Sequence, residues 1–146
     1  MSASARVLVV ANRTAATDAL LDAVRARAAA GDATFHLLVP ATAHGLHKVV
    51  DPEESDRDEA QHALDEALPR LTQAAGGEVT GEVGDPEPLA AIQDAVNLHG
   101  FDEIIVSTLP RRVSRWLRLD LVSKARGLGL PLQHVEAADQ PVGAPG

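Results

Sequence analysis

The side chains best suited to chemistry gather after two short apolar runs of the sequence. Asn12 and Arg13 follow the run at 7–11, and Ser107 and Thr108 follow the run at 104–106. Arginines then recur at positions 111, 112, 115 and 118. Guanidinium groups bind phosphates and carboxylates through paired, charge-assisted hydrogen bonds. The pattern therefore indicates a binding site for a small anion.

Other chemistries find little support in the residues. His44 and His47 stand near acidic residues, but their spacing is loose and we interpret the segment as a polar loop without a metal. There is no cysteine, hydrolase elbow, P-loop or Rossmann glycine triplet. We therefore expect no catalytic residues and no enzyme, with a weak nucleotide hydrolase as the least favoured alternative.

The overall composition indicates one domain. The chain has 146 residues, of which 45% are hydrophobic, and a net charge of -8. Nucleic acids and anionic membranes favour basic partners, so neither is expected to bind. The charge is uneven, since 51–66 is mostly acidic and 111–126 mostly basic. Because we find no cysteine, no signal-like start and no apolar stretch near the ~20 residues of a membrane span, we predict a cytoplasmic protein.

Five predicted strands alternate with helical segments, at 7–11, 34–39, 78–83, 104–106 and 130–135. The runs at 7–11 and 104–106 are apolar throughout, which is typical of interior parallel strands. Those at 78–83 and 130–135 alternate with polar residues, as edge strands do. This predicts an α/β fold, a three-layer, doubly wound, five-stranded parallel sheet in the order 3-2-1-4-5. It covers residues 1–136, and 137–146 should be a flexible C-terminal tail.

Local signals predict where the helices begin and end. Thr14 and Asp85 are suited to cap the helices that follow them. Pro69 should kink or end the helix between the second and third strands, because proline lacks a backbone donor. His36 should pack within its strand, and His99 should lie at a helix C-terminus, where its charge suits the helix dipole.

The predicted topology places a crevice between the first and fourth strands, at their carboxyl ends. In open α/β sheets, ligands bind where the connections diverge in this way. We expect the contacts to come from the segments around the two strand ends and from the end of the second strand. The expected ligand-binding residues are Asn12, Arg13, Thr14, Val39, Ser107, Thr108, Arg111, Arg112 and Ser114.

The stretch 84–110 resembles the universal stress protein family. In that family a Gly-Asp-Pro opens a helix, an Ile lies inside it and an Asp precedes the fourth strand. Here these are 84–86, Ile92 and Asp102, and the resemblance spans about residues 5–136. It implies the adenine nucleotide alpha hydrolase-like, flavodoxin-like fold and a role in stress response.

The family's ATP-binding residues are replaced in this sequence. The resemblance places its three motif glycines at Ser107, Pro110 and Asp120, and its adenine-side Asp at Asn12. Pro110 has no N–H to offer a phosphate, and Asp120 is expected to cap the last helix. We therefore predict that ATP does not bind in the family's usual mode.

The resemblance thus implies a non-enzymatic binding or regulatory module. A nucleotide or other small anion would lie in the crevice, held by side chains, and the cofactor stays unidentified. Pairing of the last strands would give a homodimer and cover an edge of the sheet. The alternative is a ligand-free module that contacts other proteins through its acidic loop and basic helix.

Overall fold

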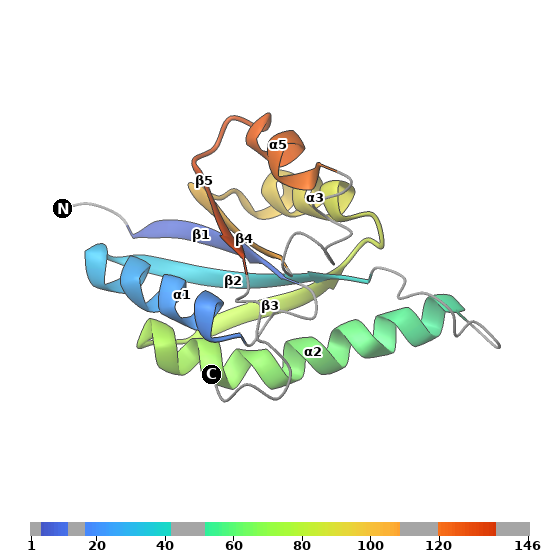
Figure 1. Cartoon of the computed structure of the whole chain (residues 1–146), viewed down its shortest axis with the longest axis horizontal. Coiled ribbons are helices and arrows are strands. Elements are labelled where there is room, and N and C mark those ends of the chain that lie inside the picture. The colour runs from blue at the N-terminus through green and yellow to red at the C-terminus, as the bar shows by residue number, and fades with distance from the viewer. Residues whose placement is uncertain (1–3, 12–16, 42–51, 109–119, 137–146) are drawn as a thin grey trace, which may run out of the picture.

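The sheet has five parallel strands in the order β3-β2-β1-β4-β5 (Figure 1). The computed structural model describes residues 4–11, 17–41, 52–108 and 120–136. The strands are β1 (Ala5–Val10), β2 (Ala33–Pro40), β3 (Val79–Gly84), β4 (Glu103–Thr108) and β5 (Leu132–Glu136). The predicted strand order is confirmed, with the two alternating strands at the edges.

Helices cover both faces of the sheet, so the predicted three-layer, doubly wound architecture is confirmed. Helices α1 (Asp18–Ala30) and α2 (Pro52–Ala75) lie on one face. Helices α3 (Pro88–His99) and α5 (Leu121–Arg126) lie on the other, above the sheet in Figure 1.

Two buried clusters, one on each face, make the core. Successive residues of a strand point to opposite faces. In β2, Leu37 therefore packs in the cluster under α1 and α2, and Leu38 packs in the cluster under α3 and α5. With few aromatic residues in the chain, Ala, Val and Leu supply most of this buried surface. The apolar strands β1 and β4 are interior because both of their faces must be buried, and β2 lies between β1 and β3.

Two helices begin later than the sequence signals predict. The N-cap of α1 is Thr17, whose hydroxyl accepts a backbone N–H three residues on at 3.3 Å, while Thr14 lies outside the described residues. The N-cap of α3 is Glu87, so the prediction of Asp85 was wrong. The Asp85 carboxylate instead accepts the N–H of Glu87 at 2.8 Å and tightens the turn that leads into the helix.

Of the two alternatives predicted for Pro69, a kink or an early end of the helix, the early end was wrong, because α2 continues through Pro69 to Ala75. Proline removes one hydrogen bond of the helix and crowds the preceding turn. Around it, Leu64, Ala67 and Leu71 are buried against the sheet. Tertiary packing supplies most helix stability in proteins, and here it offsets the lost hydrogen bond.

Asp102 and Glu103 tie the start of β4 to its neighbours. The Asp102 carboxylate accepts the backbone N–H of Arg6 at 2.8 Å, which aligns β1 and β4. The Arg27 guanidinium, at the end of α1, donates to both oxygens of Glu103, with Nη2 to Oε2 at 2.7 Å. These hydrogen bonds lower the pKa of Glu103 and raise the pKa of Arg27. The C-terminal end of α1 is therefore fixed to the sheet by an ion pair.

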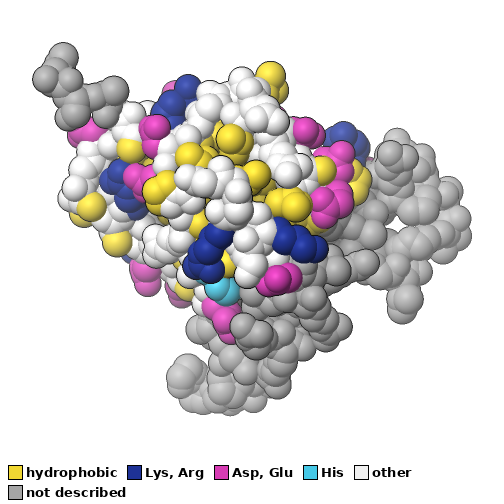
Figure 2. Space-filling model, turned by 90° about the horizontal axis from the view of Figure 1, so that it is seen from above, with side chains coloured by type: hydrophobic (Ala, Val, Ile, Leu, Met, Phe, Trp, Pro, Cys, Tyr) yellow, Lys and Arg dark blue, Asp and Glu magenta, His cyan; other side chains and the backbone are white. Residues whose placement is uncertain are grey.

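The surface over α3 and α5 carries charges of both signs interspersed with apolar side chains (Figure 2). One large apolar side chain, Leu98, is 75% exposed there. Within the described part of the chain, no helix is both long and apolar enough to cross a bilayer. The predicted tail at 137–146 lies outside the described residues.

Candidate functional site

The connections of the sheet diverge between β1 and β4, as the sequence predicts. These two strands are direct neighbours, with Val10 opposite Val106. The chain leaves β1 toward β2 on one side and leaves β4 toward β5 on the other. Ala11, which follows β1, and Thr108, the last residue of β4, are both buried at the carboxyl ends of the two strands. The topology therefore provides the expected position for a ligand crevice.

Ser107 and Thr108 lie at this edge with almost no exposed surface, at 0% and 2%. The Thr108 hydroxyl is 2.9 Å from Nε2 of His134 on β5. Buried hydroxyls require hydrogen-bond partners, and this contact fastens the carboxyl end of β4 to the edge strand. The two residues thus lie buried at the strand end where the topology predicts the crevice.

Val39 is fully buried in the cluster under α1 and α2, so its side chain serves the core. The other predicted ligand contacts lie outside the described residues, and their role remains a prediction. They are Asn12, Arg13, Thr14, Arg111, Arg112 and Ser114.

Asp120 adopts a left-handed backbone conformation, with φ of 60° and ψ of 36°. Asp120 is the N-cap of α5, as predicted, but its side chain makes no capping hydrogen bond. Among non-glycine residues it alone has positive φ in the described part of the chain. Asp tolerates this conformation better than most residues. The backbone thus retains a shape suited to glycine at the position where the family resemblance places one.

Comparison of structures finds proteins of similar fold over nearly the whole chain. A universal stress protein family member from Burkholderia pseudomallei matches with a TM-score of 0.62 and 17% identity, over 89% of this chain and 94% of that one. A universal stress protein in complex with cAMP matches with a TM-score of 0.61 and 18% identity, over 93% and 100%. A third, from Arabidopsis thaliana with AMP bound, matches with a TM-score of 0.58 and 12% identity, over 95% and 97%.

The chain has the universal stress protein fold. The predicted resemblance is thereby confirmed for the architecture. Comparisons by sequence, with family models and with curated proteins, find no match.

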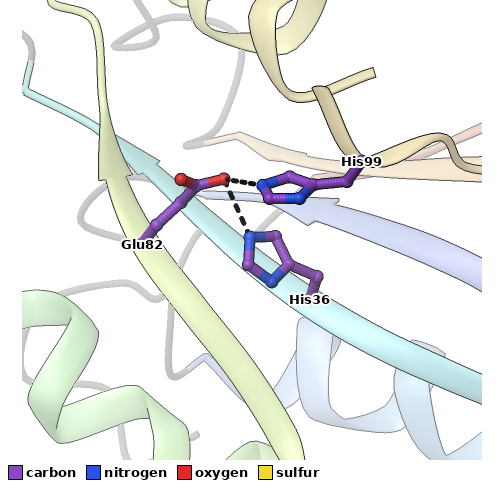
Figure 3. A group of neighbouring side chains, drawn as sticks. All are labelled: His36, Glu82 and His99. Carbon is purple, nitrogen blue, oxygen red and sulfur yellow. Dashed lines mark hydrogen bonds and ion pairs between the residues drawn. The ribbon is translucent and has the colours of Figure 1, made fainter. Parts of the chain in front are cut away.

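A polar cluster that the sequence analysis did not assemble lies elsewhere on this universal-stress-protein fold. It consists of His36 on β2, Glu82 on β3 and His99 at the end of α3 (Figure 3). Nε2 of His36 is 2.9 Å from Oε2 of Glu82, and Nε2 of His99 is 3.1 Å from the same oxygen. Because a carboxylate only accepts hydrogen bonds, both imidazoles donate to it.

Neighbouring side chains hold the two imidazole rings in place. Nδ1 of His36 is 2.7 Å from the hydroxyl of Thr80. Phe101 stacks on His36, with ring centroids 5.8 Å apart, and meets His99 edge-on at 6.0 Å. His36 was predicted to pack within its strand, and it does pack against Phe101, but its ring nitrogens also make polar contacts.

One signal for this cluster was present in the sequence. The alternation in β3 predicts that Thr80 and Glu82 share one face of the sheet. The structure pairs His36 of β2 with Thr80, and this pairing brings His36 to the same face. His99 joins them only because α3 ends above these strands and Gly100, with φ of 77°, turns the chain back toward β4. That placement depends on the packing of the helix.

Proposed function

We propose that this chain is a non-enzymatic ligand-binding module that holds a nucleotide or another small anion at the carboxyl ends of β1 and β4. The observation that carries the proposal is the divergence of the connections between these two strands. Two proteins of the same fold, from the comparisons above, have cAMP and AMP bound. Such a module would belong to the universal stress proteins and act in a stress response.

The residues near this edge favour recognition by side chains. Arg111 and Arg112 follow β4 in the sequence, in a chain of net charge -8. A local concentration of guanidinium groups would supply positive charge for an anion in a chain whose net charge is negative. Pro110 replaces a motif glycine of the family and lacks the N–H that a phosphate would accept from. We therefore propose that arginine side chains bind the anion in place of backbone amides.

Calorimetric titration with AMP, cAMP, ATP and inorganic phosphate tests the proposal. We expect at least one nucleotide to bind, and Arg111→Ala with Arg112→Ala to weaken binding by about 10-fold or more, the value of one charge-assisted hydrogen bond. Arg25→Ala is the matched control, because Arg25 lies on α1 and pairs at the surface with Asp22. Its affinity should equal that of the wild type.

Two results would contradict the proposal. The first is no binding of any of the four compounds at millimolar concentration. The second is equal loss of affinity in the double variant and in Arg25→Ala. Capture of a protein partner that depends on Arg111 and Arg112, without any ligand response, would instead support the interaction module.

The absence of catalysis is part of the proposal and has its own test. We expect no phosphate release from ATP above the buffer rate over several hours. Turnover by the wild type that disappears in Thr108→Val would overturn this part, because Thr108 lies buried at the strand end below the crevice. The valine is close to threonine in size and removes only the hydroxyl that contacts His134.

We also propose that two chains associate through β5. This strand is an edge of the sheet, and among the described strands it pairs only with β4. Edge strands present backbone groups that a second strand can bind. Light scattering across a dilution series should give the mass of two chains at micromolar concentration, and a mass of one chain throughout would exclude the dimer.

A further inference from the structure

Three side chains of types that can bind metals converge over β2 and β3. The donor atoms of His36, Glu82 and His99 all lie within 4.8 Å of one another. Figure 3 shows Nε2 of both imidazole rings directed at the same carboxylate oxygen of Glu82, with the three side chains coming from three separate elements. We propose that these residues bind a divalent transition-metal ion of the Zn²⁺ type. The proposal is independent of any ligand in the crevice.

Two of the three donor pairs need little adjustment for a metal, and the third pair, the two imidazole nitrogens, lies within 4.8 Å. Zinc lies about 2.0–2.2 Å from imidazole nitrogen and carboxylate oxygen, so ligands of a tetrahedral ion are about 3.3 Å apart. The two nitrogen–oxygen distances are 2.9 and 3.1 Å. Each pair must therefore separate by only a few tenths of an ångström to admit the ion.

The donor set selects among ions. Two imidazole nitrogens and one carboxylate oxygen suit Zn²⁺, Co²⁺ and Ni²⁺, whereas Mg²⁺ and Ca²⁺ prefer oxygen ligands throughout. Three protein ligands leave at least one coordination position for water. The exposed fractions of the side chains, 16% for His36, 33% for His99 and 35% for Glu82, give the ion access from solvent.

Metal binding here requires a change of tautomer in both rings, and at His36 a neighbouring hydroxyl can accept the relocated proton. Without metal, Nε2 of each imidazole carries a proton that it donates to Glu82. A metal takes the Nε2 lone pair, and the proton of each neutral ring moves to Nδ1, so that no proton is lost overall. The Thr80 hydroxyl, 2.7 Å from Nδ1 of His36, then accepts that proton's hydrogen bond. Outer contacts of this kind orient metal-binding histidines.

The test uses the full chain without an affinity tag, stripped of metal by a chelator and titrated with ZnCl₂ by calorimetry. We expect one Zn²⁺ per chain at this cluster, and at least about 10-fold weaker binding in His99→Ala and in Glu82→Gln. Glu82→Gln keeps the shape of the side chain and supports the test if His99→Ala does not fold. Thr80→Val should weaken binding less than either.

Other histidines of the chain serve as controls. His62 is exposed on α2, so His62→Ala should bind zinc as the wild type does. His44→Ala with His47→Ala removes the remaining pair of histidines close in sequence. This double variant should also bind one Zn²⁺ at the cluster with the affinity of the wild type.

A spectroscopic readout separates coordination from nonspecific binding. With Zn²⁺, nitrogen-15 spectra should show the proton of His36 and His99 on Nδ1, and Nε2 without one. Co²⁺ in place of Zn²⁺ should give the visible absorption of a four- or five-coordinate ion. Two results would overturn the proposal: zinc binding that is unchanged in both His99→Ala and Glu82→Gln, and zinc binding that is lost in the His44→Ala, His47→Ala double variant. So would the absence of any binding at micromolar Zn²⁺.

Discussion

The two faces of the sheet are completed in different ways. Under α1 and α2 the described strands present apolar residues from β3 across to β5, all within one buried cluster. Under α3 and α5 the apolar cluster covers β1, β4 and part of β2. Beyond it, His36, Thr80 and Glu82 occupy the face of β2 and β3.

The described helices on the two faces also differ in length. Helix α2 has 24 residues, whereas α3 has 12 and α5 has 6, and both α2 and α3 contact β2 and β3. The shorter helices leave part of the second face near solvent, and polar side chains can occupy it without the cost of full burial. One face therefore serves stability, and the other has room for a site.

The largest effect is expected from removing a buried leucine on either face. Leu37→Ala and Leu38→Ala change adjacent residues of β2, at 0% and 1% exposure, that point to opposite faces. Each should lower the free energy of unfolding by about 2–5 kcal/mol, since a cavity is left. Leu37→Ala should cost more, because α2 holds its site closed. Urea denaturation measures both, and a loss below about 1 kcal/mol for Leu37→Ala would contradict the proposed packing of that face.

A smaller effect is expected from overfilling the closed face. A Cβ at Gly81 would lie 2.6 Å from Leu64 Cδ1 and 3.2 Å from the carbonyl oxygen of Leu37. Gly81→Val should therefore cost about 1–3 kcal/mol. Gly77→Ala is the matched control, because nothing lies within 4 Å of its Cβ position, and it should leave stability equal or slightly higher. The midpoints of thermal unfolding of the two variants give the comparison. Equal midpoints would show that α2 shifts to make room for the added side chain.

Next in size is the ion pair that joins α1 to β4. Glu103→Gln should lower the free energy of unfolding by about 1 kcal/mol at pH 7, because a bidentate, partly buried contact with Arg27 is weakened. The fold lowers the pKa of Glu103. Its contribution is therefore complete above the unfolded pKa of about 4.3 and is lost as the pH falls through the lower, folded pKa.

Urea denaturation at pH 7 and at about pH 3 tests this dependence. The difference between wild type and Glu103→Gln should shrink at the lower pH. The control is Asp22→Asn, which breaks the exposed pair with Arg25 and should cost no more than about 0.5 kcal/mol. A difference that grows toward low pH would contradict the assignment.

The smallest effect is expected at the polar cluster itself. In metal-free protein, Glu82→Gln should change the free energy of unfolding by less than about 1 kcal/mol, because the carboxylate is 35% exposed and solvated. The loss in free energy of unfolding should then be several-fold larger for Leu37→Ala, on the opposite face, than for Glu82→Gln. A loss as large as that of Leu37→Ala would mean that the cluster is a structural element of the core.

The course of the chain could be predicted from local patterns, with errors at element boundaries. Residues 7–11 are apolar throughout and 78–83 alternate, which correctly places one strand inside the sheet and the other at its edge. Capping signals were less reliable, since Thr17 and Glu87 hold the positions predicted for Thr14 and Asp85. Several polar residues compete for each cap, and the packing angle of the helix selects among them.

The sequence by itself determined the alternation of strands and helices, because burial on one or both faces of a strand leaves a direct pattern of apolar residues. It also determined the divergence between β1 and β4, which follows from strand order. Only the tertiary structure decided that His36 and His99 meet at Glu82, which are 46 and 17 residues away from it. Such a meeting requires the register of β2 against β3 and the end point of α3 together, and neither is encoded within a few neighbouring residues.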